Sequence, residues 1–483
     1  MRPFGITGFF LLFVLAGFGQ GRMFDITSFG ARGDGQTNNT QFIQKAIDAA
    51  AGAGGGVVWV PGGRFLTGVL ELKSGVELRL ADNAVLLGST RRMDYGSKVA
   101  AALLIAKGQH SISITGKGII DGQGREVVED VFRLLRADSL QDPEWQHENP
   151  WHQKRPTESN RPGLIDFSRC DSVRIAGVEL KDAACWVQTY RECTHLTLED
   201  MRVESTAYWN NDGIDVVDCG EVNITGCRVN AADDGICLKS SNAQRRCENV
   251  VIQHCTVRSS ASGIKFGTAS RGGFRHVLVK DIYLYDTYRS AIALESVDGG
   301  ILEDVNVEDV YAVNTGNAIF VRLGHRAVNA PVGQVKQVKI SNVLVVVPAG
   351  KPDLGYEMEG PLIYTPHNIY PASITGLPGH PVEDITLENV EIVYRGEAHK
   401  DTAWFGKDSL EKVPEKESDY PEFSMFGEMP AWGLYVRHAN GVTLKNVSLR
   451  VKKDFRPGAI FDDVKGLKMQ DLHVSGGSII KVR

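Results

Sequence analysis

VNITGCRV, residues 222–229, contains two apolar–polar–apolar triplets separated by a two-residue break. The alternation within each triplet is the period-two pattern of a β-strand, and the break is typical of a turn into a second strand. The same pattern begins at further positions along the chain: Val173, Leu196, Val250, Val277, Val305, Val338, Ile385, Val442 and Leu467.

The first seven copies of this pattern begin 23–33 residues apart. A period of this length is typical of a solenoid, in which each coil buries its apolar face by stacking on its neighbours. The β-branched residues and the lack of a 3.6-residue period exclude helical repeats. We therefore predict an all-β chain folded as a right-handed parallel β-helix, with residues 22–483 forming a single domain.

One helix is predicted before the repeats. It runs from about Thr40 to Ala51, and one face carries Phe42, Ile43, Ala46, Ile47 and Ala50. Because the open end of a solenoid needs a cover, we expect this helix to cap the N-terminal end.

The first 21 residues have the features of a secretory signal peptide. A positive start is followed by an apolar run at residues 9–16 and by small residues at Gly17, Gly19 and Gly21. The alternative is a buried terminal strand. We predict export to the periplasm or the extracellular space, and the later sequence contains no apolar stretch long enough to span a membrane.

Composition excludes some partners. The 53 lysines and arginines against 59 aspartates and glutamates give a net charge of −6, which argues against nucleic acid as a partner. The 52 glycines, with only 18 prolines, indicate many turns. We expect a monomer that acts on a polysaccharide or oligosaccharide.

All eight cysteines lie between Cys170 and Cys255. Four of them precede repeat starts by three residues and should form one column through the coils, namely Cys170, Cys193, Cys219 and Cys247. They could form disulfides or could be small buried side chains, and their spacing indicates no zinc site.

Three long interruptions of the repeats, at about 124–165, 347–381 and 395–435, are expected to gather on one face and shape a binding groove.

Carboxylates cluster just before two repeat starts. Asp212 follows Asn210 and Asn211, and Asp233 and Asp234 come 21 residues later, about one coil. Carboxyl groups in adjacent coils cannot all ionise cheaply, so at least one pKa should rise. An acid and a base within reach of one bond is the requirement for glycoside hydrolysis. Calcium binding and a solvated acidic turn are the alternatives.

The chain resembles glycoside hydrolase family 28, the polygalacturonase-like enzymes. The resemblance rests on residues 24–35, 118–124 and 161–167, on Asn210-Asn211-Asp212 and on Asp233-Asp234. It implies that Asp233 is the general acid and that Asp212 and Asp234 activate the water of an inverting displacement. Inverting enzymes usually separate their carboxyl groups by about 6.5–9.5 Å.

Two departures from the family pattern concern substrate recognition. Ser262 stands where the family has a histidine, and Ala293-Leu294-Glu295 stands where it has Arg-Ile-Lys. Lys239, Lys265 and Arg289 could bind a sugar carboxylate instead, and we expect the two lysines at corresponding positions of neighbouring coils. The full set of predicted substrate-binding residues is Asn210, Lys239, Lys265, Glu295, Arg289, Trp209, Arg322 and His325.

We therefore predict an exported inverting glycoside hydrolase that acts on pectic or related acidic polysaccharide, with a galacturonate- or rhamnogalacturonan-type substrate. Endo and exo action are both open, and insertions that block one end of the groove would favour exo action. The enzyme would need no cofactor and no metal. One alternative is a polysaccharide lyase with Lys239 or Lys265 as its base, and another is a non-catalytic carbohydrate-binding β-helix. We also expect Gly213 and Gly235, which follow the aspartates, to leave room for a sugar.

Overall fold

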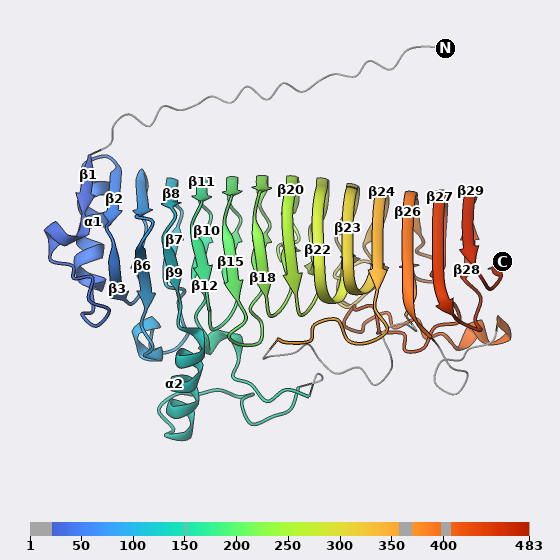
Figure 1. Cartoon of the computed structure of the whole chain (residues 1–483), viewed down its shortest axis with the longest axis horizontal. Helices are drawn as coiled ribbons and strands as arrows, with labels where there is room; N and C mark the ends of the chain where they lie inside the picture. The colour runs from blue at the N-terminus through green and yellow to red at the C-terminus, as the bar shows by residue number, and fades with distance from the viewer. Residues whose placement is uncertain (1–21, 150–151, 357–369, 398–406, 483) are drawn as a thin grey trace, which may run out of the picture.

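The computed structural model describes residues 22–149, 152–356, 370–397 and 407–482. The predicted signal peptide, residues 1–21, and parts of all three insertions lie outside them. The strands stack along one axis from β1 at the N-terminal end to β28 and β29 near the C-terminus (Figure 1). All the ladder pairings between these strands are parallel, so the chain is a parallel β-helix as predicted.

Strand pairing follows three ladders that run the length of the solenoid. The first ladder contains β1 (Met23–Asp25), β2 (Gly56–Val60), β5 (Val76–Leu80), β8 (His110–Gly116), β11 (Asp171–Ala176), β14 (Thr194–Glu199), β17 (Gly220–Thr225), β20 (Cys247–Ser259), β22 (Gly273–Ser296), β23 (Ile301–Leu323), β24 (Gln334–Val347), β26 (Val382–Glu397), β27 (Leu434–Lys453) and β29 (Lys468–Ser475). The second contains β3 (Gly63–Thr67), β6 (Ala84–Gly88), β9 (Ile119–Asp121), β12 (Glu179–Lys181), β15 (Arg202–Ser205) and β18 (Arg228–Ala231), and then joins β20.

The third ladder, which we call the site ladder, carries the candidate active site. It contains β4 (Leu70–Glu71), β7 (Leu104–Lys107), β10 (Ile165–Ser168), β13 (Gln188–Arg191), β16 (Ile214–Val217), β19 (Ile236–Ser240), β21 (Ile264–Ser270), β25 (Ala372–Thr375), β28 (Ala459–Lys465) and β30 (Ile479–Lys481). Parts of the long strands β22, β23 and β27 complete it.

The predicted repeat is confirmed by the strand register. The repeat starts from Val173 to Val442 pair directly with one another along the first ladder, in the order Val173, Leu196, Val222, Val250, Val277, Val305, Val338, Ile385 and Val442. Their side chains are buried, and each coil contributes them to one continuous core. The coils therefore stabilise one another through apolar burial.

The two-residue break within each repeat has a backbone cause. A residue in the left-handed region stands at this break in successive coils, including Asp200, His254, Asp281, Asn342 and Asn389. Asparagine, aspartate and histidine adopt this conformation more readily than other non-glycine residues. The chain can thus turn at each break, which separates β17 from β18 and bends β20 and later strands without ending them.

Helices are few and lie outside the three ladders. Helix α1 (Thr40–Gly52) forms where predicted, buries Ile43, Ala46, Ile47 and Ala50, and packs at the N-terminal end against the first strands (Figure 1). Helix α2 (Gly124–Arg136) projects from the side of the solenoid. Short 3₁₀ turns are η1 (Ile26–Phe29), η2 (Arg92–Tyr95), η3 (Glu158–Asn160) and η5 (Lys407–Lys412). No helix within the described ranges has both the length and the apolar character to cross a membrane.

The cysteines are buried free thiols. None of the eight is in a disulfide, and the Cys193 N–H donates to Cys219 Sγ over 3.2 Å, which places these two in adjacent coils as predicted. Of the two possibilities that the spacing left open, the structure has the column of small buried side chains. Thiols of this size fill the narrow interior without leaving an unpaired polar group, because they donate to backbone carbonyls.

The glycines beside the aspartates serve coil stacking and not the sugar. A Cβ added to Gly235 would lie 2.3 Å from Cγ1 of Val257 and 2.8 Å from the carbonyl oxygen of Gly263. At Gly213 it would lie 2.4 Å from Cγ1 of Val229. At both glycines an added Cβ would point into the core, so the expectation that these positions leave room for substrate is wrong.

We expect Gly235→Ala to destabilise the protein by about 1–3 kcal/mol, because the new methyl group overpacks a closed interior. Urea unfolding measures this loss. Gly52→Ala is the matched control, since nothing lies within 4 Å of a Cβ at the end of α1. Equal stability of the two variants would contradict the close-packing explanation.

Candidate active site

The site is built from three consecutive turns that precede strands of the site ladder. Backbone hydrogen bonds join these turns, from Gly213 N–H to the Asp234 carbonyl (2.9 Å) and from Gly235 N–H to the Ser262 carbonyl (2.8 Å). Ile214 pairs with Ile236, so one coil here is 22 residues, and Asp212 lies opposite Asp234. The expected 21-residue match of Asp212 with Asp233 is therefore off by one position.

Three carboxyl groups meet at these turns. One oxygen each of Asp212, Asp233 and Asp234 lies within 4.8 Å of the other two. Asp212 and Asp234 are buried, whereas Asp233 is half-buried and lines a pocket. Such a trio could in principle ligate a cation, but lysines already compensate two of its members. The arrangement places one accessible carboxyl group beside two buried ones.

Asp212 is bound by a buried lysine. The Lys239 Nζ donates to Asp212 Oδ2 over 3.0 Å and also contacts Asp215 Oδ1. Burial raises the pKa of Asp212 well above its ordinary value, and the charge of Lys239 offsets this only in part. Burial also raises the pKa of Asp215 to about 6, against the opposing effect of Lys239. Because a single lysine is shared by two buried carboxyl groups, one of these two groups is favoured to carry a proton.

The pKa of Asp234 is shifted in the opposite direction to that of Asp212. It accepts a hydrogen bond from the Ser262 backbone N–H (3.0 Å) and lies 3.2 Å from Lys265 Nζ. Burial acts to raise its pKa, but Lys265 and Arg289 together lower that pKa below its ordinary value. Asp234 is therefore held as a carboxylate. Ser262, at the family's histidine position, contributes its backbone N–H to this.

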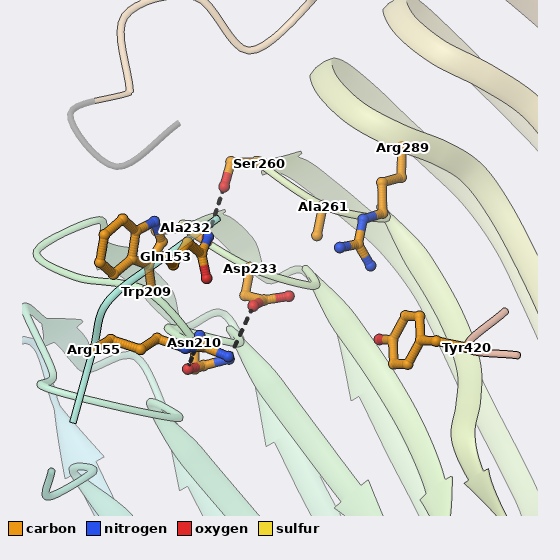
Figure 2. Close-up of a pocket in the computed structure, with 10 residues that line it drawn as sticks. All are labelled: Gln153, Arg155, Trp209, Asn210, Ala232, Asp233, Ser260, Ala261, Arg289 and Tyr420. Carbon is orange, nitrogen blue, oxygen red and sulfur yellow. Dashed lines mark hydrogen bonds between the residues drawn. The ribbon is translucent and has the colours of Figure 1, made fainter. Parts of the chain in front are cut away.

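Asp233 reaches into the pocket between two groups of side chains (Figure 2). Its Oδ1 accepts from the Asp234 N–H (2.9 Å), and Asn210 Nδ2 donates to its Oδ2 over 3.4 Å. The pocket lining is Gln153, Arg155, Trp209, Asn210, Ala232, Asp233, Ser260, Ala261, Arg289 and Tyr420. The predicted residues Asn210, Trp209, Arg289 and Asp233 are thus brought together.

Insertions supply lining residues that the repeat pattern did not predict. Gln153 and Arg155 come from the first insertion, and Tyr420 comes from the third. In Figure 2, Arg289 and Tyr420 lie on one side of Asp233, and Arg155 lies with Trp209 on the other. The sequence predicted that the insertions shape a groove, but insertions carry no periodicity that would single out these residues within them.

A wall of hydrogen bonds orients Asn210. Its Oδ1 accepts from Arg161 Nη2 (2.7 Å) and from Arg155 Nη1, which leaves its amide nitrogen to face Asp233. Arg161 also donates to the Trp209 carbonyl over 2.6 Å. Arg161 was not predicted as a site residue, although it begins one of the segments that carry the family resemblance. These contacts hold Asn210 and Trp209, which both line the pocket.

Three predicted substrate-binding residues lie beneath the pocket. Lys239, Lys265 and Glu295 are 8%, 1% and 1% exposed, and none of them lines the pocket. Lys265 pairs in register with Cys237, so the expectation that the two lysines occupy corresponding positions is wrong. The anions near the lysines are aspartates and Glu295, within hydrogen-bonding or ion-pair distance.

Arg322 and His325 are placed away from the pocket. Arg322 is 1% exposed and donates to the carbonyls of Glu415 (2.6 Å) and Gly376 (3.2 Å). His325 Nε2 lies 2.8 Å from the Ala330 carbonyl oxygen. Both residues hold loops at the far end of the site-ladder strands, so they correct the expectation that this polar cluster forms a subsite wall.

Comparison with known proteins identifies the family. The model of glycosyl hydrolases family 28 matches residues 56–351. A probable polygalacturonase of Vitis vinifera is 24% identical over 322 residues, 62% of this chain and 56% of that protein. An exo-poly-alpha-D-galacturonosidase of Dickeya chrysanthemi is 45% identical over 121 residues, 21% of this chain and 20% of that protein. The chain thus aligns with only about half or less of these two relatives.

A solved structure has the same fold. The hyperthermoactive exopolygalacturonase of Thermotoga maritima superimposes with a TM-score of 0.60 at 23% identity, covering 77% of this chain and 87% of that one. At this level of identity the likeness concerns the fold.

Proposed function

Because this chain belongs to glycosyl hydrolase family 28, we propose that it removes sugar units from the end of a pectic or related acidic polysaccharide. The observation that carries the proposal is the placement of Asp233 in a pocket beside two buried carboxyl groups. The pKa of one of them, Asp212, is raised, and the pKa of the other, Asp234, is lowered. The relatives named as a probable polygalacturonase and an exo-poly-alpha-D-galacturonosidase support the choice of an acidic sugar.

In the proposed mechanism, Asp233 gives its proton to the glycosidic oxygen as the bond to the sugar breaks. Asp234, held as a carboxylate, takes a proton from the attacking water, while Asp212 holds that water in place. A water hydrogen-bonded to two oxygens can span up to about 5.5 Å between them. The 4.8 Å limit on the carboxyl oxygens is compatible with such a bridge.

The stereochemical outcome tests this water assignment. The oxygens are closer than the carboxyl separation of about 6.5–9.5 Å usual for inverting enzymes, and retaining enzymes have about 5–5.5 Å. We nevertheless expect inversion, because Asp212 and Asp234 are buried beneath Asp233 and hold a water better than they reach a sugar carbon. Proton NMR of the first product anomer reads the result. A retained configuration would identify a carboxylate nucleophile and overturn the water step.

Side chains on both sides of Asp233 underlie the proposal of exo action. Arg155 and Trp209 line the pocket on one side, and Tyr420 stands opposite (Figure 2). We expect monosaccharide or disaccharide as the initial product from polygalacturonate, with little early fall in viscosity. A rapid loss of viscosity at low release of reducing ends would contradict exo action and favour an open cleft.

The lyase alternative needs a basic residue beside the sugar. The two candidate lysines, Lys239 and Lys265, are buried in ion pairs with carboxylates, which disfavours either as a base for substrate. Absorbance from an unsaturated product would nevertheless establish a lyase.

We also propose that residues 1–21 are removed on export and that the enzyme acts as a monomer. N-terminal sequencing of the secreted protein and its sedimentation in solution would test these two points.

A further inference from the structure

Two buried lysines beneath the pocket each bridge a pair of carboxyl groups. Lys239 joins Asp212 to Asp215, and Lys265 lies 3.2 Å from Asp234 and 4.0 Å from Glu295. All of these side chains are buried. The proposed mechanism uses Asp212 and Asp234, but it gives no role to the two carboxyl groups behind the lysines.

We propose that Glu295 is a positioning residue that holds Lys265 beside Asp234 and thereby helps to keep Asp234 a carboxylate. The inference rests on the proposed function, because it concerns the group that accepts a proton from water. It reassigns Lys265 from substrate binding to support of Asp234. In the resemblance described above, Glu295 takes the place of a basic residue. This chain therefore has an acidic side chain next to Lys265.

The position of Lys265 supports this role. Its Nζ has three neighbours at short range, namely Asp234, Glu295 and the Tyr420 hydroxyl at 3.2 Å. With 1% of its surface exposed, it cannot meet a sugar carboxylate without breaking these contacts. A buried cation that loses a partner carries a large free-energy cost, so the lysine is retained for the carboxylates.

The backbone leaves space for the Glu295 carboxylate. Gly267 in β21 has a φ of 111°, and a Cβ there would lie 3.0 Å from Glu295 Oε2. The groups facing Glu295 from the surrounding elements are Lys265, Asp234, Arg289, Arg322 and Arg326. Burial raises the pKa of Glu295 to about 7, although Lys265 opposes this. Glu295 is thus poised to change charge near neutral pH.

Three substitutions separate the charge of Glu295 from its place beside the lysine. Lys265→Met removes the cation and should raise the pKa of Asp234. Glu295→Leu removes the group that holds the lysine and should raise that pKa by a smaller amount. Because the pKa of Glu295 is about 7, Glu295 is already protonated at the pH where Asp234 titrates, so Glu295→Gln should leave the pKa of Asp234 nearly unchanged. A purely structural role for Glu295 predicts lower activity or stability but no displacement of the pH profile.

The test is the pH dependence of kcat/KM on a pectic oligosaccharide. We expect the acidic limb to move up by about one unit in Lys265→Met, up by about half a unit in Glu295→Leu, and not at all in Glu295→Gln. Lys265→Arg should restore the wild-type limb in part. The matched control is Glu308→Gln, which removes a partly exposed partner of Lys280 at 2.9 Å and should leave the limb in place. An unmoved limb in Lys265→Met or in Glu295→Leu would overturn the proposal.

A second readout does not need activity. Since the pKa of Glu295 is raised from 4.5 to about 7 in the folded chain, the wild type should lose stability as pH rises through that window. Glu295→Gln lacks this loss, so its Tm relative to wild type should be higher at pH 8 than at pH 5. A Tm difference that does not change with pH would contradict the charge state assigned to Glu295. If this shift occurs but no pectic substrate is hydrolysed, the proposed function fails while the charge coupling stands.

Discussion

Replacing Asp233 with asparagine is expected to lower kcat by about 10²–10⁴-fold, the contribution typical of a general acid. Asp233 is the one member of the carboxyl trio that lines the pocket, so it is the group that can reach a glycosidic oxygen. Asparagine has nearly the same shape and can still accept a hydrogen bond from Asn210 or from the Asp234 N–H. The loss should therefore appear in kcat, with little change in Tm.

The control for this substitution is Asp281→Asn. Asp281 has a φ of 52° at an outer turn, where asparagine is tolerated, and its carboxylate contacts His254 on the surface. We expect wild-type kcat for this variant. An Asp233→Asn enzyme with more than about a tenth of the wild-type kcat would show that another group donates the proton. Because Asp212 has a raised pKa, it would then be the next candidate.

Arg289→Leu is expected to lower kcat/KM for an acidic oligosaccharide by about 10²-fold, the cost of losing a charge-assisted contact with the sugar carboxylate. Arg289 is 7% exposed, lines the pocket and lies 3.5 Å from Glu422. Its Nε makes this contact with Glu422 and is itself buried. Because Arg289 also lines the pocket, the rest of its guanidinium can meet a ligand there.

A neutral substrate separates recognition from structure. The same oligosaccharide with its carboxylates reduced to alcohols should lose far less on Arg289→Leu than the acidic form does. Arg289→Lys should recover part of the activity, because it keeps the charge but not the planar pair of donors. Arg245→Gln, an exposed arginine near Glu192, is the matched control. Equal losses on both substrates would mean that Arg289 supports Asp234 without selecting the sugar.

The repeat and the cluster of three aspartates could be predicted from the sequence because both are local. Side chains of a strand alternate between faces with a period of two, so a buried column such as Val222 and Val250 appears directly as a spacing. Asp233 and Asp234 are contiguous and begin a coil, so their place at a turn follows from the same pattern. Helix α1 was predictable for a similar reason, since its apolar face repeats at helical spacing.

Which residues face one another across coils was decided by the tertiary structure. Coil length varies with the turns, and a shift of two positions places Lys265 opposite Cys237 and not opposite Lys239. Register then determines which carboxylates share each lysine and hence the different pKa directions of Asp212 and Asp234.

The sequence by itself determined the solenoid and the cluster of three aspartates, because each depends on neighbours along the chain. Only the tertiary structure brought Arg155 and Tyr420 to opposite sides of Asp233, since they come from insertions that follow no repeat. It also placed Lys265 and Glu295 beneath the pocket, where burial makes them partners of Asp234. Contacts between distant segments depend on how the coils stack, and no local pattern encodes them.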